Sequence, residues 1–533
     1  MTHELVLGVD AGHTVTKAVL FDATGRAVAR AGGTVPLKSP QPHWVERDMD
    51  EVWQTAFQAV AACLAEVGSD AGRAVAAVGL AGHGDGLYSV DGQGRPVRAG
   101  IVAMDTRAES VLQEWRGTPV WSRAMELSGT VPFAGSPAAL LAWLARHEPG
   151  ALVQARWLLS CKDWLRLKLT GAVATDPTDA SASFTDMRRG GYSPELLDLY
   201  GLGALARLLP PVLACDAVSG TVTQEAAALT GLIAGTPVVT GAHDVDAAAL
   251  GIGGTTPGEL CLIAGSFSIN QVVSERPVVD PRWQVRHFVR PGQWMTMSTS
   301  PASVANLEWF LRVTGAPADQ RYGVHEAIGR EVEACLEGPS EVLFHPFVYG
   351  SPHPHPASGT FLGLRGWHGR GHLLRALMEG VVLNHRWHVD ALCSKLPVTG
   401  AATRLTGGAA HSAVWSQMFA DALRRPVVVT DVQESATRGA ALLAATAVGL
   451  LDDVTDPRAT PPYSGATTPP QPGRRTRRGV PGVPGDVGGS RAGLGSPGRA
   501  RGSGVSAGRA GDMRDRQAFG HDHCRYPGVG TPL

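Results

Sequence analysis

The sequence has no long unbroken apolar run, no large excess of charge and no segment that resembles a signal peptide. No apolar run approaches the ~18 residues of a membrane-spanning helix, and the N-terminus leads straight into a strand pattern without a basic segment. The 47 Lys and Arg against 48 Asp and Glu give a formal net charge of −1, whereas a nucleic-acid partner normally requires a basic face. We therefore expect a soluble, cytoplasmic protein that acts on a small ligand, with neither a membrane nor a nucleic-acid partner.

Cysteine is also scarce and unpaired. The seven cysteines are an odd number, and no two of them form a Cys-x-x-Cys motif. This pattern is typical of reduced thiols in the cytosol rather than of a disulfide framework. With 533 residues, of which 44% are hydrophobic, the chain is long enough for two large domains.

A third deficit begins after about Thr455. From there to the end the chain has no Lys, Ile or Trp, and Gly, Pro, Arg and Ser dominate. Such a segment cannot bury enough apolar surface to offset its ordering entropy, so residues 456–533 are expected to form a disordered tail. An arginine-rich run within it also fits a basic interaction tail, and a shifted reading frame in GC-rich coding sequence would give the same composition.

What is present is an alternation of strand and helix patterns. The chain opens with a meander of three antiparallel strands, predicted at Leu5–Val9, Val15–Phe21 and Ala27–Ala31. A helix at Asp50–Val67 and a strand at Val75–Leu80 follow, so the predicted class is α/β.

The second half repeats this opening plan with little residue identity. A strand at Thr236–Thr240 ends the first half, and we expect a first domain over 1–240 and a second over 241–455. The helices predicted for the second half are Ser303–Val313, His372–Cys393, Ser412–Leu423 and Ala436–Val448.

Two of the predicted hairpins have turns that suit phosphate. Gly8-Val9-Asp10-Ala11-Gly12 and Gly265-Ser266-Phe267-Ser268 place small residues where backbone N–H groups and hydroxyls can approach phosphate oxygens. Asp10, at the end of its strand, suits Mg²⁺ held through water against the phosphates. Taken alone, the first turn is equally an ordinary hairpin with an Asp cap. Further hydroxyl and ammonium contacts are expected from Thr14, Thr16 and Lys17.

An acidic pair, Asp244 and Asp246, precedes the second hairpin. A carboxylate beside phosphate-binding turns can accept a proton from an attacking hydroxyl, and these parts together are the minimal equipment of a kinase. Asp246 is the rival base. In an extended segment it would point to the face opposite Asp244.

Three polar clusters lie between residues 39 and 107, each beside apolar elements. A polyol pocket needs several fixed donors and acceptors, which clustered Asp, His, Arg and Glu side chains provide. Any one cluster taken singly is more often a polar surface turn, whereas three in series favour a pocket. The candidates for sugar contacts are His83, Asp85, Asp105 and Arg107, with Glu46 a looser one.

From about residue 5 to 450, the order of these motifs resembles that of the FGGY carbohydrate kinases. The two hairpins and Gly241-Ala242-His243-Asp244 resemble the family's phosphate and catalytic-base motifs. Leu405–Ser412 with Trp415 resembles its adenosine motif, and Arg438–Leu442 its closing helix. The resemblance implies two actin-like (ribonuclease H-like) ATPase domains with a cleft between them.

The resemblance also implies the chemistry. Members phosphorylate a primary hydroxyl with ATP and Mg²⁺, so Asp244 would accept the hydroxyl proton and Asp10 would hold the metal. A homodimer is a family-level expectation. The nucleotide contacts that it implies are Asp10, Gly12, Thr14, Lys17, Gly265, Ser266, Gly407, Gly408, Ala409 and Ser412.

Within the family, Ser39–Pro42, Asn306–Phe310 and Glu379–Val382 look like the L-xylulose kinase branch, which implies a pentulose substrate. The loop Gly82–Gly86 also resembles polyol kinases of the erythritol type. A non-catalytic, sugar-sensing relative is the alternative of another class, and the presence of both carboxylates of the kinase motifs argues against it. The chain departs from the family where the tail replaces a further helical stretch.

Overall fold

The computed structural model describes residues 5–13, 15–315, 324–351, 357–430, 432, 434–461 and 468–471. All of them lie in the first of two compact units, residues 1–478, and the second unit, residues 479–533, lies outside the described part. Thr14 and most of the predicted tail also lie outside it. None of the helices among the described residues is both long enough and apolar enough to span a bilayer.

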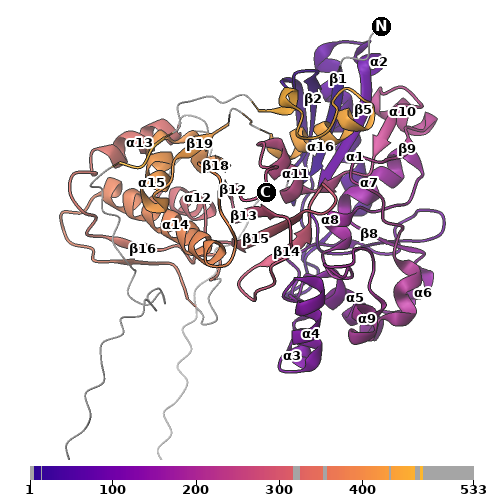
Figure 1. The fold of residues 1–533 in the computed structure, drawn as a ribbon, viewed down its shortest axis with the longest axis horizontal. Coiled ribbons are helices and arrows are strands. Elements are labelled where there is room, and N and C mark those ends of the chain that lie inside the picture. Colours follow the sequence, from indigo (N-terminus) through magenta and orange to yellow (C-terminus); the bar gives the residue numbers. More distant parts are fainter. Residues whose placement is uncertain are drawn as a thin grey trace, which may run out of the picture. The chain divides into compact units, whose positions relative to one another are not determined.

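The first half builds a mixed sheet, drawn from indigo to magenta in Figure 1. Its first three strands form an antiparallel meander, and the next runs parallel to the first. This confirms the predicted opening plan. In sheet order, the strands are β3 (Ala27–Thr34), β2 (Val15–Asp22), β1 (Leu5–Ala11), β5 (Val75–Gly82), β10 (Pro237–Val239) and β9 (Val218–Thr221).

The second half builds a second sheet on the same plan, which confirms the predicted repeat. An antiparallel hairpin pairs with a third antiparallel strand on one side and with a parallel strand on the other. In sheet order, the strands are β14 (Gln284–His287), β15 (Trp294–Ser300), β13 (Ser268–Ser274), β12 (Leu260–Ala264), β18 (Thr403–Thr406) and β19 (Val427–Val429).

Amphipathic helices cover both sheets. α1 (Met49–Val67) is capped by Asp48, whose carboxylate accepts from the backbone N–H groups of Asp50 and Glu51, and its apolar face packs on β2 and β3. α12 (Ala305–Val313), α14 (Arg370–Cys393) and α15 (Ala413–Leu423) help to form the core of the second half. The four predicted second-half helices therefore exist within a few residues of their expected bounds.

Two helices from the second half of the sequence pack on the first sheet. α11 (Asp244–Gly251) and α16 (Ser435–Ala447) contact each other, and both lie against β5. Gly79 on β5 has no room for a Cβ atom, because the carbonyl of Ala440 on α16 lies over it. The segment that holds the predicted base thus packs with the first half, while the expected boundary at residue 240 stays a prediction.

Part of the predicted tail is folded. A short helical turn, η4 (Pro457–Ala459), begins at Asp456, and the carbonyl of Ala459 accepts a hydrogen bond of 3.0 Å from Arg438 Nη2. Further on, Thr468 pairs with Val427 of β19 through two backbone hydrogen bonds of 2.9 Å. The change in composition after Thr455 therefore does not mark the end of the packed chain, because residues beyond it still form hydrogen bonds with the second half.

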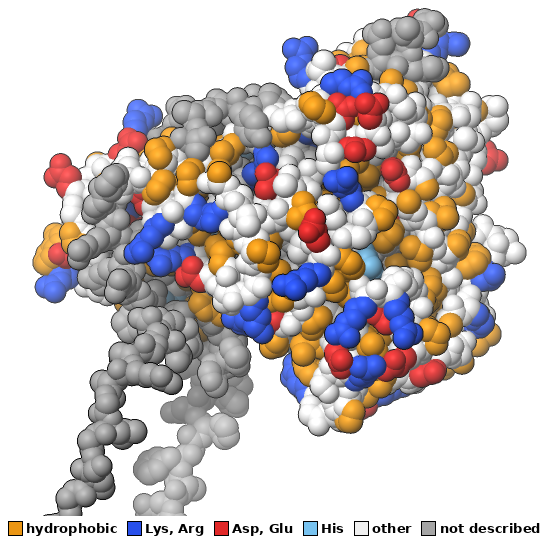
Figure 2. Space-filling model, viewed as in Figure 1, with side chains coloured by type: hydrophobic (Ala, Val, Ile, Leu, Met, Phe, Trp, Pro, Cys, Tyr) orange, Lys and Arg blue, Asp and Glu red, His pale blue; other side chains and the backbone are white. Residues whose placement is uncertain are grey.

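The remaining elements surround these layers. On the face shown in Figure 2, acidic and basic side chains intermingle, as the balanced composition predicts. The other helices and strands are α2 (Ala71–Ala74), β4 (Glu46–Arg47), β6 (Tyr88–Val90), β7 (Gly100–Ile101), α3 (Glu109–Trp115), α4 (Pro119–Ser128), α5 (Pro137–His147), α6 (Pro149–Gln154), β8 (Trp157–Leu159), α7 (Cys161–Thr170), α8 (Pro177–Ala180), α9 (Pro194–Leu199), η1 (Gly203–Leu208), α10 (Gln224–Thr230), β11 (Ala242–His243), α13 (Val324–Glu333), β16 (Leu343–His345), β17 (Thr360–Leu362) and η3 (Gly408–His411).

Candidate active site

The candidate site lies where β1 and β5 end. β11 pairs with the end of β5, Ala242 opposite Ala81 and His243 opposite Gly82, and α11 starts at the next residue. The N–H of His83 donates to the carbonyl of Ala11 at 2.9 Å. The first phosphate hairpin, the polar loop after β5 and the predicted base therefore meet at one sheet edge, the usual place for ligands in α/β proteins.

Asp244 is the first residue of α11, and its side chain keeps 26% of its area exposed. Burial raises the pKa of its carboxyl well above the ordinary value, and the negative charges of Asp10 and Asp179 raise it further. A carboxylate with such a raised pKa is suited to accept a proton near neutral pH.

Asp246 faces away from this position. The sequence indicated that Asp246 would point away from Asp244 if the segment were extended, and the structure shows that the segment is helical from Asp244 onwards. On a helix, residues two apart still point in nearly opposite directions. The carboxylate of Asp246 is fully buried, with Oδ2 3.4 Å from Nδ1 of His243. Asp246 is therefore held in the interior.

Asp10 lies at the end of β1, beside Asp244. Burial raises the pKa of its carboxyl to about 6, against the opposing effect of Lys17, and the negative charge of Glu434 raises it as well. Its Oδ1 is buried without a hydrogen-bond partner among the described residues. A free carboxylate oxygen is the kind of ligand that Mg²⁺ prefers, so this residue fits the metal that the family chemistry implies.

The other predicted residues of the first hairpin have protein partners. The N–H of Gly12 donates to the carbonyl of Val15 at 3.1 Å and closes the turn. Lys17 Nζ lies 2.7 Å from Oε2 of Glu434, which comes from the start of α16. Their contacts with phosphate stay predictions, as does that of Thr14 outside the described residues.

His83 and Asp85 lie in the loop after β5. The His83 ring lies 4.3 Å from that of His13, and its Nε2 lies 3.2 Å from the Tyr88 hydroxyl. Burial holds the pKa of His83 well below its usual range, so its neutral ring offers one donor and one acceptor. Asp85 has a left-handed backbone (φ 57°), and its Oδ2 accepts a hydrogen bond of 2.6 Å from Arg286 Nη2.

Three residues at this site were missed by the sequence interpretation: Asp179, His243 and Arg286. A Cβ atom at Gly84 would lie 2.7 Å from Asp179 Oδ1 and would overlap the His243 ring, so the polar loop runs directly against both. Burial and the positive charge of Arg286 hold the pKa of His243 well below its usual range. Asp179 and Arg286 have no local signal, because more than 90 positions separate the loop from each of them, whereas His243 directly precedes Asp244 in the motif Gly241–Asp244.

Several buried polar atoms here lack a hydrogen-bond partner in the part of the chain that the structure describes. Leaving a buried donor or acceptor unsatisfied costs about 1–3 kcal/mol, so such a group of atoms indicates a place for a polar ligand. A ligand with several hydroxyl groups can both donate to and accept from this set. Those nearest the loop and the predicted base include Asp10 Oδ1, His13 Nε2, His83 Nδ1, Asp85 Oδ1, Asp179 Oδ1 and Arg286 Nε, and the deeper His243 Nδ1 and both oxygens of Asp246 also lack a hydrogen-bond partner among the described residues.

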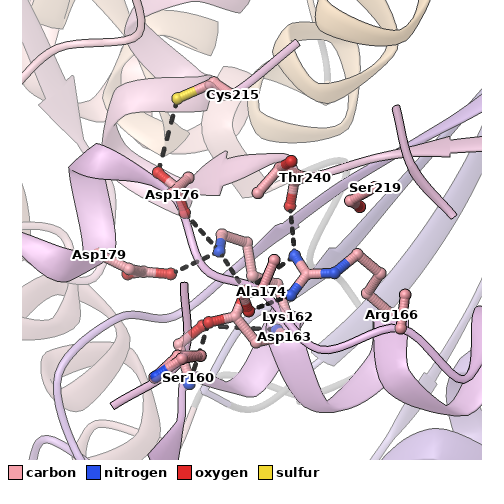
Figure 3. Close-up of polar contacts among 12 residues, drawn as sticks. Ser160, Lys162, Asp163, Arg166, Ala174, Asp176, Asp179, Cys215, Ser219 and Thr240 are labelled. Atoms are coloured by element: carbon pink, nitrogen blue, oxygen red, sulfur yellow. Dashed lines mark hydrogen bonds and ion pairs between the residues drawn. The ribbon is translucent and has the colours of Figure 1, made fainter. Parts of the chain in front are cut away.

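A charge cluster centred on Lys162 supports one side of the site (Figure 3). The ammonium of Lys162 lies 2.7 Å from Asp163 Oδ1, 2.5 Å from Asp176 Oδ2 and 2.9 Å from Asp179 Oδ2. Arg166 contacts Asp163 as well, at 3.0 Å. The three carboxylates are spaced closely enough to hold a metal ion, but the ammonium already occupies their centre. The cluster therefore fixes the position of Asp179 and leaves its Oδ1 facing the loop.

Three predicted sugar contacts instead form a separate ion network. Both oxygens of Asp105 accept hydrogen bonds, from Arg107 and from the N–H of Val45, and Arg107 also donates to Glu46 at 2.7 Å. The guanidinium lies 3.8 Å from the centre of the Trp44 ring. These groups are bonded to one another, although Arg107 Nη1 has no hydrogen-bond partner among the described residues. Their contacts with a sugar stay predictions.

The predicted nucleotide residues of the second half come together. Gly407 (φ 92°) contacts the second hairpin so closely that a Cβ atom would lie 2.6 Å from the carbonyl of Ala264. Gly408 and Ala409 follow in η3, while Gly265 and Ser266 form the hairpin turn. The hydroxyl of Ser412 caps α15 by accepting from the N–H of Trp415. The roles of these residues toward a nucleotide stay predictions.

Comparison with known proteins places this geometry in a family. Residues 5–251 match the N-terminal domain, and residues 263–448 the C-terminal domain, of the FGGY family of carbohydrate kinases. The chain is 33% identical to the L-xylulose/3-keto-L-gulonate kinase of Escherichia coli (strain K12), over 83% of this chain and 88% of that protein.

Two further similarities agree with this match. The erythritol kinase of Brucella abortus (strain 2308) is 30% identical, over 84% of this chain and 88% of the relative. The crystal structure of xylulose kinase from Rhodospirillum rubrum matches with a TM-score of 0.78 and 30% identity, covering 88% of this chain and 94% of that one. The chain therefore belongs to the FGGY family of carbohydrate kinases and is an ATP-dependent sugar kinase.

Proposed function

We propose that this kinase transfers the γ-phosphoryl group of ATP to a primary hydroxyl of a pentulose, L-xylulose or xylulose, with Asp244 as the general base. The observation that carries the proposal is the position of Asp244: partly exposed, with a raised pKa, between the Asp10 hairpin and the loop of His83 and Asp85. The name of the R. rubrum relative and the L-xylulose in the name of the E. coli relative support the choice of sugar, while the second compound in the E. coli name, 3-keto-L-gulonate, is a sugar acid.

Different residues of the chain carry out the separate steps of the reaction. His83 and Asp85 orient the sugar hydroxyls, and the carboxylate of Asp244 takes the proton from the hydroxyl oxygen as that oxygen attacks. Asp10 would hold Mg²⁺, which when bound neutralises charge on the phosphates. The two hairpin turns bind the phosphates, and the segment of Gly407, Gly408 and Ala409 binds the adenosine.

A polyol of the erythritol type is the second candidate substrate. Two observations favour it: hydroxyl groups alone can satisfy the unpartnered atoms around Gly84, and the chain resembles the B. abortus erythritol kinase. The oligomeric state proposed from the family is a homodimer, which light scattering on the purified protein would test.

The test is coupled ADP release with Mg-ATP across L-xylulose, D-xylulose, L-ribulose, erythritol, xylitol and glycerol. We expect strong stimulation by a pentulose, and phosphorus NMR of the product should show a phosphomonoester on a primary carbon. Stimulation by erythritol alone would select the second candidate. A folded sample that binds ATP and responds to none of these compounds would contradict the proposal.

A further inference from the structure

A buried arginine of the second sheet reaches the proposed sugar pocket. Arg286 lies on β14, and its side chain is only 1% exposed. The strand is fixed to the first half on both sides of it. The N–H of Val285 donates to the carbonyl of Gly129 at 2.9 Å, and the N–H of His287 donates to Ser181 Oγ at 3.2 Å. The guanidinium is therefore held in place by its backbone.

Arg286 is one side chain away from the catalytic base. Its Nη1 lies 3.3 Å from His243 Nε2, which lies 3.6 Å from Asp244 Oδ1. Its Nη2 donates to Asp85 at 2.6 Å and contacts Gln284 Oε1 at 3.3 Å. His243 therefore joins the proposed base to the pair of Arg286 and Asp85, and all four residues border the same site.

Arg286 and Asp85 are joined by one hydrogen bond, from Nη2 to Oδ2. Nε of Arg286 and Oδ1 of Asp85 are both buried and have no hydrogen-bond partner among the residues that the structure describes. A hydroxyl group can satisfy both atoms, because its oxygen accepts from Nε and its proton is donated to Oδ1. A carboxylate can accept from Nε, but it has no proton for Oδ1.

The surrounding charges oppose a second anion. Arg286 already has a counterion in Asp85, and the carboxylates of Asp179 and Asp246 act on the same guanidinium. Arginine is otherwise the side chain best suited to bind a carboxylate, through two parallel hydrogen bonds. Here a substrate carboxylate would bring like charges together in a buried place, which is strongly unfavourable.

We propose that the pair of Asp85 and Arg286 selects uncharged ketoses and polyols and excludes sugar acids, with Asp85 as the specificity-determining residue. This inference rests on the proposed function, since it names the substrate class of the same site. It follows that loss of the Asp85 charge would leave Arg286 as a binding site for a substrate carboxylate.

The test compares wild type with Asp85→Asn, which keeps the size of the side chain and removes its charge. Turnover is measured with the best neutral sugar of the panel and with D-gluconate and L-gulonate. Wild type should prefer the neutral sugar. In Asp85→Asn, the ratio of kcat/KM for sugar acid over neutral sugar should rise at least ~10-fold, mainly through KM. An unchanged ratio, or a wild type that uses sugar acids equally well, would overturn the proposal.

Two control variants distinguish the effect of the lost charge at Asp85 from a general effect on folding. The double variant Asp85→Asn, Arg286→Gln should lose the gain toward sugar acids, because the gain requires the guanidinium. Asp390→Asn, at an exposed carboxylate on α14, should leave the ratio unchanged. Persistence of the gain without Arg286 would contradict the proposed role of the pair. Thermal unfolding and ATP binding show whether each variant is folded.

Calorimetric binding gives a readout that does not depend on turnover or on the variant. Wild type should bind a neutral pentulose and should not bind a sugar acid at the same concentration. Equal binding of both would overturn the selection rule even if Asp85→Asn failed to fold. If wild type phosphorylates none of the sugars, the proposed function fails, and this titration still decides the charge preference of the pocket.

Discussion

The two charged regions beside β5 differ in how far their charges are paired: the ammonium of Lys162 is saturated by three carboxylates, whereas the residues of the pocket around Gly84 leave several donors and acceptors unpartnered. Asp179 belongs to both regions, and within the cluster Arg166 Nε also lacks a hydrogen-bond partner among the described residues. In the cluster, the ammonium meets three carboxylates, and Arg166 shares one of them. In the pocket, buried donors and acceptors lack partners within the described part of the chain. Saturated groups stabilise the fold, while unsaturated groups of the same chemical types are available to a ligand.

The largest expected effect comes from breaking the Lys162 cluster. Lys162→Met leaves buried carboxylates without their cation, and we expect a loss of about 3–5 kcal/mol in the free energy of unfolding. Lys38→Met, at a surface ammonium that also pairs with two carboxylates, should change stability little. Denaturant unfolding of both variants measures the difference. Equal effects would show that burial of the cluster does not matter.

A substitution among the residues around Gly84 should lower the activity rather than the stability. His83→Gln removes one proposed sugar contact, and a lost hydrogen bond of this kind lowers kcat/KM for the sugar by roughly 10- to 100-fold. The KM for ATP should stay unchanged. Steady-state kinetics with each substrate varied in turn measures this. A loss confined to ATP would contradict the placement of His83 on the sugar side.

Truncation distinguishes packed from unpacked parts of the tail. Ending the chain after residue 455 removes the carbonyl partner of buried Arg438 and the strand pairing of Thr468, with an expected loss of about 1–3 kcal/mol. Ending it after Arg478, the last residue of the first compact unit, should leave stability unchanged. A thermal unfolding comparison checks both. If the chain that ends after residue 455 melted at the same temperature as the chain that ends after Arg478, the contacts of residues 456–461 and 468–471 would not contribute to stability.

The smallest effect is a shift in pH dependence. Burial raises the pKa of Asp179 to about 7, against the opposing effect of Lys162, and its negative charge contributes to the raised pKa of Asp244. Asp179→Asn removes that charge, so the pKa of Asp244 falls and the carboxylate form persists to lower pH. The acid limb of the kcat/KM profile should therefore move to lower pH. A shift to higher pH, or none, would contradict this coupling.

Local pattern was enough for most of the fold and for half of the site. Strand alternation and helical periodicity predicted the first meander, the second hairpin and the long helices, because these signals depend on neighbouring residues. Asp10 and Asp244 were predicted from adjacent turn residues, and their roles stay predictions. The sequence left open whether residues 244–246 are extended or helical, and in the helix that forms Asp246 still points away from Asp244.

The rest depends on tertiary contacts. Arg286 enters the pocket from another sheet, and Asp179 is positioned by Lys162, so neither carries a local signal. Glu46, Asp105 and Arg107 show the converse problem. A cluster of charged residues in sequence has the same composition whether its members face a ligand or one another, and here they are paired with one another.

The central claim is that Asp244 is the base of a sugar kinase, and single-turnover phosphoryl transfer from Mg-ATP to the preferred pentulose tests it most directly. Asp244→Asn should bind ATP and sugar as wild type does and transfer the phosphoryl group roughly 10²- to 10⁴-fold more slowly. Transfer at the wild-type rate in a folded Asp244→Asn protein would contradict the account.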